Sequence, residues 1–159
     1  MNKITLTCSA FGPGMAIPKL HTGEGPDTSP QLSWSDLPPN TRELALIVDD
    51  PDAPTPQPWV HWVLYKIPSA LSGLPAGIAK TAILKQPPGA LQGETSWGKV
   101  GYFGPLPPKG HGVHHYYFKL FALDQPLSLA AGVSKEALLA AMRGHVLGEG
   151  ELIGTYERK

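Results

Sequence analysis

The segment Leu44–His61, with the sequence LALIVDDPDAPTPQPWVH, constrains the fold of this chain more than any other. Its first five residues are branched and apolar, which is typical of a buried strand. The segment then changes into an acidic, proline-rich loop over 49–54. Because proline has no amide donor and a fixed φ, a central strand cannot continue there. The carboxylates at this strand end either line a pocket or bond nearby amides in a turn.

Length and composition predict one mainly β domain over residues 1–159. The 18 glycines and 18 prolines, together with 42% hydrophobic residues, are typical of a globular protein rich in loops and turns. A formal net charge of zero gives no electrostatic reason to expect binding to nucleic acid or to an anionic membrane.

The only cysteine, Cys8, excludes an internal disulfide and a metal site built from several cysteines, and we expect it to be buried. The first ten residues lack the apolar core of a signal peptide. No apolar run approaches the length of a transmembrane segment. We therefore expect a soluble, cytoplasmic protein.

Local patterns of apolar and polar residues predict a set of short strands. They are expected at Ile4–Ser9, Ala16–Leu20, Gln31–Trp34, Arg42–Asp50, Trp59–Ile67, Val113–Leu123 and Glu151–Tyr156. The stretch Gln86–Gly112 is irregular, so it is either a functional loop or contains a short element that the pattern hides. One helix is predicted from Lys135 to about His145, with Ser134 as its N-cap.

Polar side chains stand where three of these strands begin or end. Asp50 ends one strand, His61 begins the next, and His114 with Tyr116 begins a third. If these ends meet at one mouth of a sandwich, they present imidazole and phenol donors beside a carboxylate, which suits a small anion. Gly104, Pro105 and Gly110 could bring backbone amides to the same place. The alternative is that each histidine is a hydrogen-bonded structural residue.

The other histidines, His21, His111, His115 and His145, are expected at the surface or at the ends of elements, without assigned roles. No nucleophile elbow, phosphate-binding P-loop or His-Glu-x-x-His motif is present. A zinc centre of Asp50, His61 and His114 would fit the ligand chemistry, although the spacing lacks a short His-x-His pair. We therefore expect no metal and no cofactor, and a metal-assisted hydrolase is kept as an alternative.

Taken together, several motifs resemble the phosphatidylethanolamine-binding protein family, in particular its bacterial branch of Raf-kinase-inhibitor-like proteins. They are DPDAP at 50–54, WVHW at 59–62, GP at 104–105 and GHGVHHY at 110–116, supported by SPQLSW at 29–34 and by the tail from Gly144 to Tyr156. The match spans nearly the whole chain in the expected order.

The resemblance implies an antiparallel, Greek-key β-sandwich with a few peripheral helices, one of them near the C-terminus. It also implies a small pocket for phosphate-like anions and phosphoryl head groups. Carried over to this chain, the ligand-binding residues are Asp50, His61, His114, Tyr116, Gly104, Pro105, Pro54 and Trp59. A cis peptide is expected at Ala53–Pro54, and the resemblance leaves a homodimer open.

Three residues depart from the pattern of many bacterial relatives. Phe103 stands where glycine is common, Leu106 where cysteine is frequent, and His115 where arginine is usual. The first could narrow the pocket and the last weakens its positive field. The leading hypothesis is thus a non-enzymatic protein that binds a phosphorylated small molecule or anion. The alternative is an interaction protein that inhibits a kinase or a protease through its surface loops.

Overall fold

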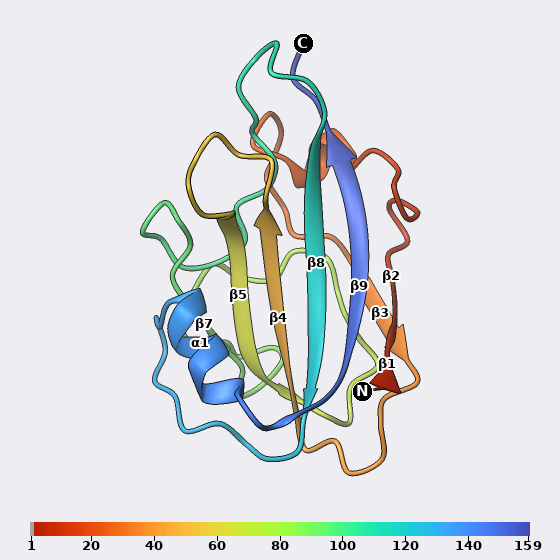
Figure 1. The fold of residues 1–159 in the computed structure, drawn as a ribbon, viewed down its shortest axis with the longest axis vertical. Coiled ribbons are helices and arrows are strands. Elements are labelled where there is room, and N and C mark those ends of the chain that lie inside the picture. Colours follow the sequence, from red (N-terminus) through yellow and green to blue (C-terminus); the bar gives the residue numbers. More distant parts are fainter. Residues whose placement is uncertain (1) are drawn as a thin grey trace.

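The computed structural model describes residues 2–159 and consists mainly of two β-sheets (Figure 1). The larger sheet contains, in spatial order, β1 (Asn2–Lys3), β9 (Val146–Tyr156), β8 (His114–Leu123), β4 (Glu43–Asp50), β5 (Trp59–Pro68) and β7 (Leu91–Gln92). The smaller sheet contains β2 (Thr5–Thr7), β3 (Leu32–Ser35) and β6 (Gly73–Leu74). The helical elements are the 3-10 helix η1 (Lys19–His21) and the α-helix α1 (Lys135–Met142). The mainly β prediction is confirmed.

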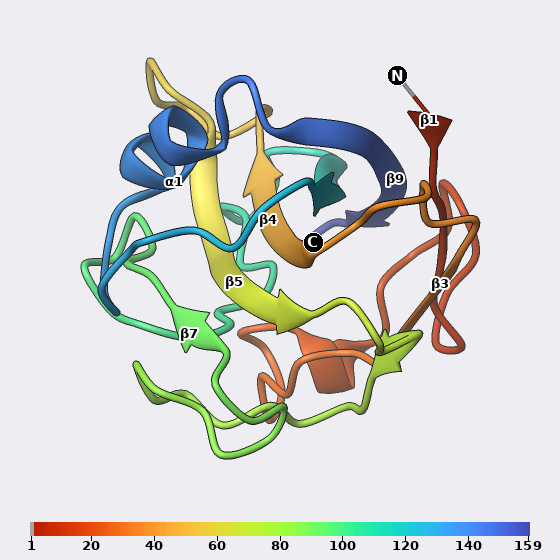
Figure 2. The ribbon, with the colours of Figure 1, turned by 90° about the horizontal axis from the view of Figure 1, so that it is seen from below.

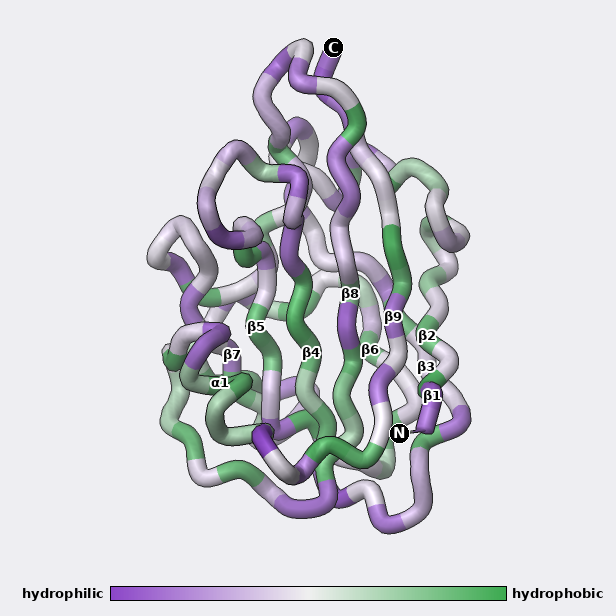
Figure 3. Tube along the Cα trace, viewed as in Figure 1, coloured by the Kyte–Doolittle hydropathy of each residue, from purple (hydrophilic) through white to green (hydrophobic). Residues whose placement is uncertain are grey.

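Strand β4 occupies the centre of the larger sheet, and all eight of its residues are buried. It pairs antiparallel with β5 on one side and with β8 on the other. Alternate residues of β4 enter different cores, since Leu44, Leu46 and Val48 belong to one hydrophobic cluster and Ala45 and Ile47 to another. Burial on both faces explains why the run 44–48 is continuously apolar rather than alternating. In Figure 3, β4 is hydrophobic along most of its length and hydrophilic at its upper end.

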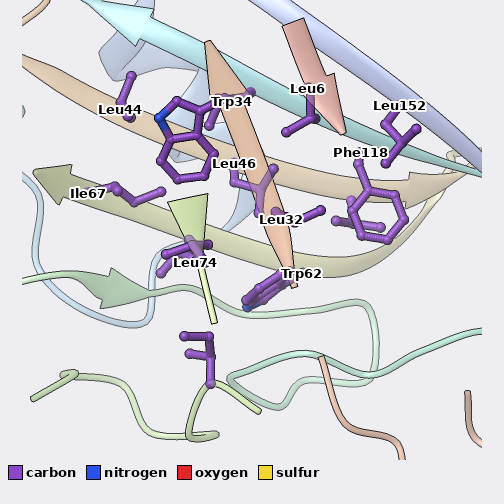
Figure 4. Close-up of a cluster of buried hydrophobic side chains, with 14 of the residues drawn as sticks. Leu6, Leu32, Trp34, Leu44, Leu46, Trp62, Ile67, Leu74, Phe118 and Leu152 are labelled. Carbon is purple, nitrogen blue, oxygen red and sulfur yellow. The ribbon is translucent and has the colours of Figure 1, made fainter. Parts of the chain in front are cut away.

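The first cluster fills the space between the two sheets, where Trp34 and Leu32 of β3 face Leu46 of β4 and Trp62 of β5 (Figure 4). The second cluster covers the opposite face of the larger sheet, where Leu138 and Met142 of α1 pack. Figure 2 shows α1 beside β5 and away from β3. The sheet is therefore enclosed on both faces, and side chains at its strand ends remain available to form a site.

The predicted strands mostly agree with the structure. Strand β8 alternates as the sequence pattern predicted, and the residues of one face, His114, Tyr116, Phe118, Leu120 and Ala122, are all buried. The irregular stretch 86–112 contains the short strand β7, which pairs with β5. The last strand is longer than predicted because it begins at Val146 and runs along the whole of β8.

Helix α1 begins as predicted, and Ser134 caps it by accepting a hydrogen bond from the amide of Ala137 at 3.1 Å. It ends at Met142 rather than near His145, because Gly144 adopts a left-handed backbone conformation with φ of 82°. Among residues 2–159, no helix is long and apolar enough to cross a membrane.

Other predictions were wrong. The region 16–20 contributes only a single bridge, from Ala16 to Thr155, and Pro18 precedes the 3-10 helix η1 there. The cis peptide lies at Gln86–Pro87 instead of Ala53–Pro54. Cys8 is only partly buried.

Candidate functional site

The ends of three adjacent strands meet at one edge of the larger sheet, which is the upper edge in Figure 1. Strand β4 ends there, whereas β5 and β8 begin there, since both run antiparallel to β4. Asp50 lies opposite Trp59 in the register of β4 and β5. The register thus brings Asp50, His61, His114 and Tyr116 together, as their positions at strand ends predicted.

These side chains line a pocket of about 260 Å³. Its lining residues are Asp50, Ala53, Pro54, Thr55, Trp59, His61, Trp97, Leu106, Pro107, Pro108, His114 and Tyr116. Six of the eight predicted ligand-binding residues are among them. The polar groups come from the strands, and the loops at 53–55 and 106–108 supply a mostly apolar rim. No lysine or arginine lines the pocket.

The structure places Gly104 and Pro105 behind the wall of this pocket. The amide of Gly104 donates to Asp27 Oδ1 at 2.7 Å, so it does not face the pocket as a free donor. A Cβ at Gly104 would collide with the carbonyl of His21, which explains the glycine by lack of space. The carbonyl of Pro105 accepts from the amide of Gly23 at 2.8 Å. Both residues therefore support the wall rather than line the pocket.

Asp50 is 3% exposed, and both of its carboxylate oxygens are hydrogen bonded. Oδ1 accepts from the amide of Asp52 at 2.7 Å, which closes the turn after β4. Oδ2 lies 2.6 Å from His114 Nδ1. A carboxylate can only accept, so His114 Nδ1 carries a proton and donates it. Asp50 thus closes the turn after β4 and also lines the pocket.

His111 extends this pair into a chain of three residues. His111 Nδ1 lies 2.6 Å from His114 Nε2, and the two ring centroids are 4.9 Å apart. The order of contacts is Asp50, His114, His111. The sequence analysis gave His111 no role, and the only signal for one was its position between two glycines close to His114.

His61 is the second imidazole of the pocket and is 3% exposed. Burial lowers its pKa, and the carbonyl of Phe103 and the charge of Asp50 offset this only in part, so the ring is neutral near pH 7. Nδ1 donates to the carbonyl of Phe103 at 2.5 Å, which leaves Nε2 as an acceptor. The ring is held edge-to-face by Trp97 and Tyr116, with centroid distances of 5.0 and 5.1 Å.

Tyr116 supplies a phenol that stays protonated. Burial raises its pKa, and the nearby carboxylate of Asp50 raises it further. The hydroxyl therefore offers an O–H donor at every pH at which the protein is studied.

The rim residues Trp97, Pro107 and Pro108 were not predicted from the sequence. Trp97 packs edge-to-face on Trp59 with centroids 5.5 Å apart, and Leu106, Pro107 and Pro108 complete the rim. Trp97 and Leu106 also border a neighbouring cavity of about 200 Å³ that includes Asp27 and Lys99. Trp97, Leu106, Pro107 and Pro108 lie in irregular segments, where periodicity gives no signal.

Of the three residues that depart from the family pattern, Leu106 lines the pocket, whereas Phe103 and His115 do not. The carbonyl of Phe103 orients His61, and its ring lies 4.7 Å from Lys80 Nζ. His115 bonds Asp52 Oδ2 through its amide at 2.8 Å and through Nδ1 at 2.7 Å, which tethers the acidic loop to β8. Burial favours a higher pKa for Asp52, but these two bonds outweigh it and lower the pKa.

The histidines without assigned roles also differ in burial. His21 lies at the end of η1, which is one of the two expected positions, but it is buried, with 4% exposure and its Nδ1 bonded to the carbonyl of Thr28. His145 is paired with Asp124 at 2.9 Å beyond the opposite end of β8. Across residues 2–159, no group of three or more His, Cys, Asp or Glu side chains is arranged to hold a metal ion.

Comparison with known proteins is consistent with this geometry. The family model described as phosphatidylethanolamine-binding protein matches residues 7–157. The chain belongs to the phosphatidylethanolamine-binding protein family. A UPF0098 protein from Methanothermobacter thermautotrophicus is 46% identical over 155 residues, covering 98% of this chain and 99% of that protein.

Two solved structures of the family have the same fold. Escherichia coli YbcL, described as a new member of the mammalian PEBP family, has a TM-score of 0.91 and 33% identity, with 99% of this chain and all of that chain covered. A putative family homolog from Chlamydia trachomatis has a TM-score of 0.87 and 41% identity over the full length of both chains. The resemblance deduced from the sequence motifs is confirmed.

Proposed function

We propose that this protein is a non-enzymatic pocket protein that binds a phosphoryl group, either as a free anion or on a small molecule or head group. The observation that carries the proposal is the meeting of Asp50, His61, His114 and Tyr116 around one pocket at the end of the larger sheet. Membership of a family named for phosphatidylethanolamine binding supports the same ligand class.

Three side chains of the pocket, those of Tyr116, His114 and His61, combine hydrogen-bond donors with one acceptor. Tyr116 donates through its hydroxyl, and a protonated His114 donates through Nε2, while His61 accepts through Nε2. Asp50 balances the charge of a protonated His114, so an approaching anion meets a neutral pair rather than a bare carboxylate. This set matches a singly charged phosphoryl group, whose P–O–H donates to His61 and whose other oxygens accept.

The size and rim of the pocket limit the rest of the ligand. A volume of about 260 Å³ holds a phosphoryl group with a small substituent and excludes two acyl chains. The indole rings of Trp59 and Trp97 offer apolar contact to the atoms next to the phosphoryl group. Because no lysine or arginine lines the pocket, we expect modest affinity for inorganic phosphate and tighter binding of phosphoesters that also contact the rim.

Calorimetric titration with inorganic phosphate and with O-phosphoethanolamine tests the proposal. The wild-type protein should bind at least one of them saturably. His61→Ala should bind at least about tenfold more weakly, because the variant lacks the Nε2 acceptor of His61. His145→Ala is the matched control, since it removes an exposed, aspartate-paired histidine from the opposite end of β8. Circular dichroism checks that each variant is folded.

Unchanged affinity in a folded His61→Ala variant would contradict the proposal. The interaction-protein alternative predicts a different result: Asp50→Ala and His61→Ala variants would still capture a kinase or a protease in a pull-down. Turnover of a phosphoester by the purified protein would instead overturn the non-enzymatic part of the proposal.

A further inference from the structure

His114 has no free ring nitrogen in this structure, although it is the donor on which the pocket depends. It is 2% exposed, with Nδ1 held by Asp50 Oδ2 and Nε2 held by His111 Nδ1, each at 2.6 Å. An imidazole has only these two hydrogen-bonding atoms. A phosphoryl oxygen can therefore reach His114 only by replacing His111.

His111 is carried on a segment suited to such a replacement. It is exposed and stands between Gly110 and Gly112, whose φ values of 73° and 92° lie in the left-handed region. An added Cβ would meet no atom within 4 Å at either glycine, so backbone conformation rather than space requires glycine at both positions. Two backbone hydrogen bonds hold the segment on the N-terminal side of the His111 side chain: the amide of Gly110 donates to the carbonyl of Arg158 at 2.9 Å, and the amide of His111 donates to the carbonyl of Pro108 at 3.2 Å. Small backbone rotations at the two glycines can swing the imidazole away from His114.

The hydrogen bond between the two imidazoles also sets a requirement on protons. One ring must donate and the other must accept, because two N–H groups cannot bond each other. With His114 Nδ1 donating to Asp50, a neutral His114 presents the lone pair of Nε2 and accepts from His111. A phosphoryl oxygen, which is itself an acceptor, repels that lone pair. The ligand thus needs a proton on His114 Nε2 and the departure of His111.

We propose that His111 is a specificity-determining residue that competes with the phosphoryl ligand for His114 Nε2. The proposal rests on the proposed function of the pocket. An oxyanion that is a strong hydrogen-bond acceptor displaces the imidazole of His111 and enters the pocket. Ligands with only weak acceptors leave the hydrogen bond between His111 and His114 intact. His111 is accordingly a competing group and makes no contact of its own with the bound phosphoryl group.

Affinities of four proteins for inorganic phosphate test the competition. His111→Ala should bind phosphate about three- to tenfold more tightly than the wild type, since one hydrogen bond no longer has to be broken. His111→Asn keeps a hydrogen-bonding group near the Nδ1 position and should remain close to the wild type. His145→Ala, which removes an exposed histidine remote from the pocket, should match the wild type.

Ring nitrogen NMR of the wild-type protein supplies a second readout. Adding phosphate should shift the His111 signals toward those of an imidazole in water, as the bond to His114 is lost. Equal or weaker binding by His111→Ala, with the wild type binding phosphate, would overturn the competition and leave the pocket proposal standing. Absence of saturable phosphate and phosphoester binding in both proteins would overturn the two proposals together.

Discussion

Two neighbouring carboxylates, Asp49 and Asp50, end the same strand and lie on opposite faces of the larger sheet. Both are almost fully buried, and each has a basic nitrogen at 2.6 Å. Asp49 pairs with Lys135 of α1, on the face covered by the helix. Asp50 pairs with His114 of β8, on the face that carries the pocket.

The difference between these pairs lies in the partner. An ammonium group keeps its charge across the physiological pH range and offers only donors, so the Asp49 pair fixes the start of α1 against the sheet. An imidazole gains or loses its proton near neutral pH and has a second nitrogen. The Asp50 pair can therefore respond to a ligand, whereas the Asp49 pair can only hold the fold together.

The largest effect expected from this comparison is on stability at Asp49. Asp49→Ala leaves the ammonium of Lys135 only partly exposed and without its partner, and should lower the free energy of unfolding by about 3 kcal/mol. Its affinity for phosphate should match the wild type. Urea unfolding and calorimetry measure the two quantities, and a loss of phosphate affinity in the folded variant would break the distinction between the faces.

The reverse pattern is expected at Asp50. Asp50→Ala should weaken phosphate binding by at least about tenfold, because His114 loses the carboxylate that accepts from its Nδ1 and orients its ring in the pocket. The free energy of unfolding should fall by about 1–2 kcal/mol, because the Nδ1–H of His114 and the amide of Asp52 both lose their acceptor but neither is a permanent charge. A stability loss as large as that of Asp49→Ala, with unchanged affinity, would show that both pairs are structural.

Acid should destabilise the protein through His61. Burial lowers the pKa of this ring below its ordinary value of 6.5, so the unfolded chain takes up a proton that the folded protein does not. The stability that depends on neutral His61 is complete above pH 6.5 and is lost progressively as the pH falls toward the lowered folded pKa. His61→Gln should show a shallower loss in this window, and equal slopes for the two proteins would contradict the assignment.

The smallest effect is expected for His115. Its pair with Asp52 is exposed on both sides, so His115→Ala should cost less than about 1 kcal/mol of unfolding free energy. The amide of residue 115 still bonds Asp52 in this variant and should keep the acidic loop in place. Thermal unfolding of the variant beside the wild type provides the check.

The parts of the site that the sequence predicted are those governed by strand alternation. Asp50 ends an apolar run, and His114 and Tyr116 begin an alternating one, so the faces of these side chains follow from a period of two residues. Their meeting at one edge depends on the antiparallel pairing of the strands. The family motif added Pro54 and Trp59 to the predicted site. The continuous run 44–48 likewise predicted a central strand with two buried faces.

The remaining features depend on contacts between irregular segments. Trp97 and Leu106 line the pocket because of the course that the irregular stretch 86–112 takes. His111 contacts His114 from a segment whose flanking glycines adopt a left-handed conformation. The position of Gly104 behind the wall depends on its bond to Asp27, a residue 77 positions away in the chain. Such placements are set by tertiary contacts, which local patterns do not encode.

The most direct test of the central claim is an NMR titration of the histidine ring signals with O-phosphoethanolamine and inorganic phosphate, beside His61→Ala. We predict saturable shifts at His61, His114 and His111, with His145 unmoved, and loss of these shifts in the variant. Flat titrations, or shifts that persist unchanged in a folded His61→Ala protein, would contradict a phosphoryl-binding pocket at this end of the sheet.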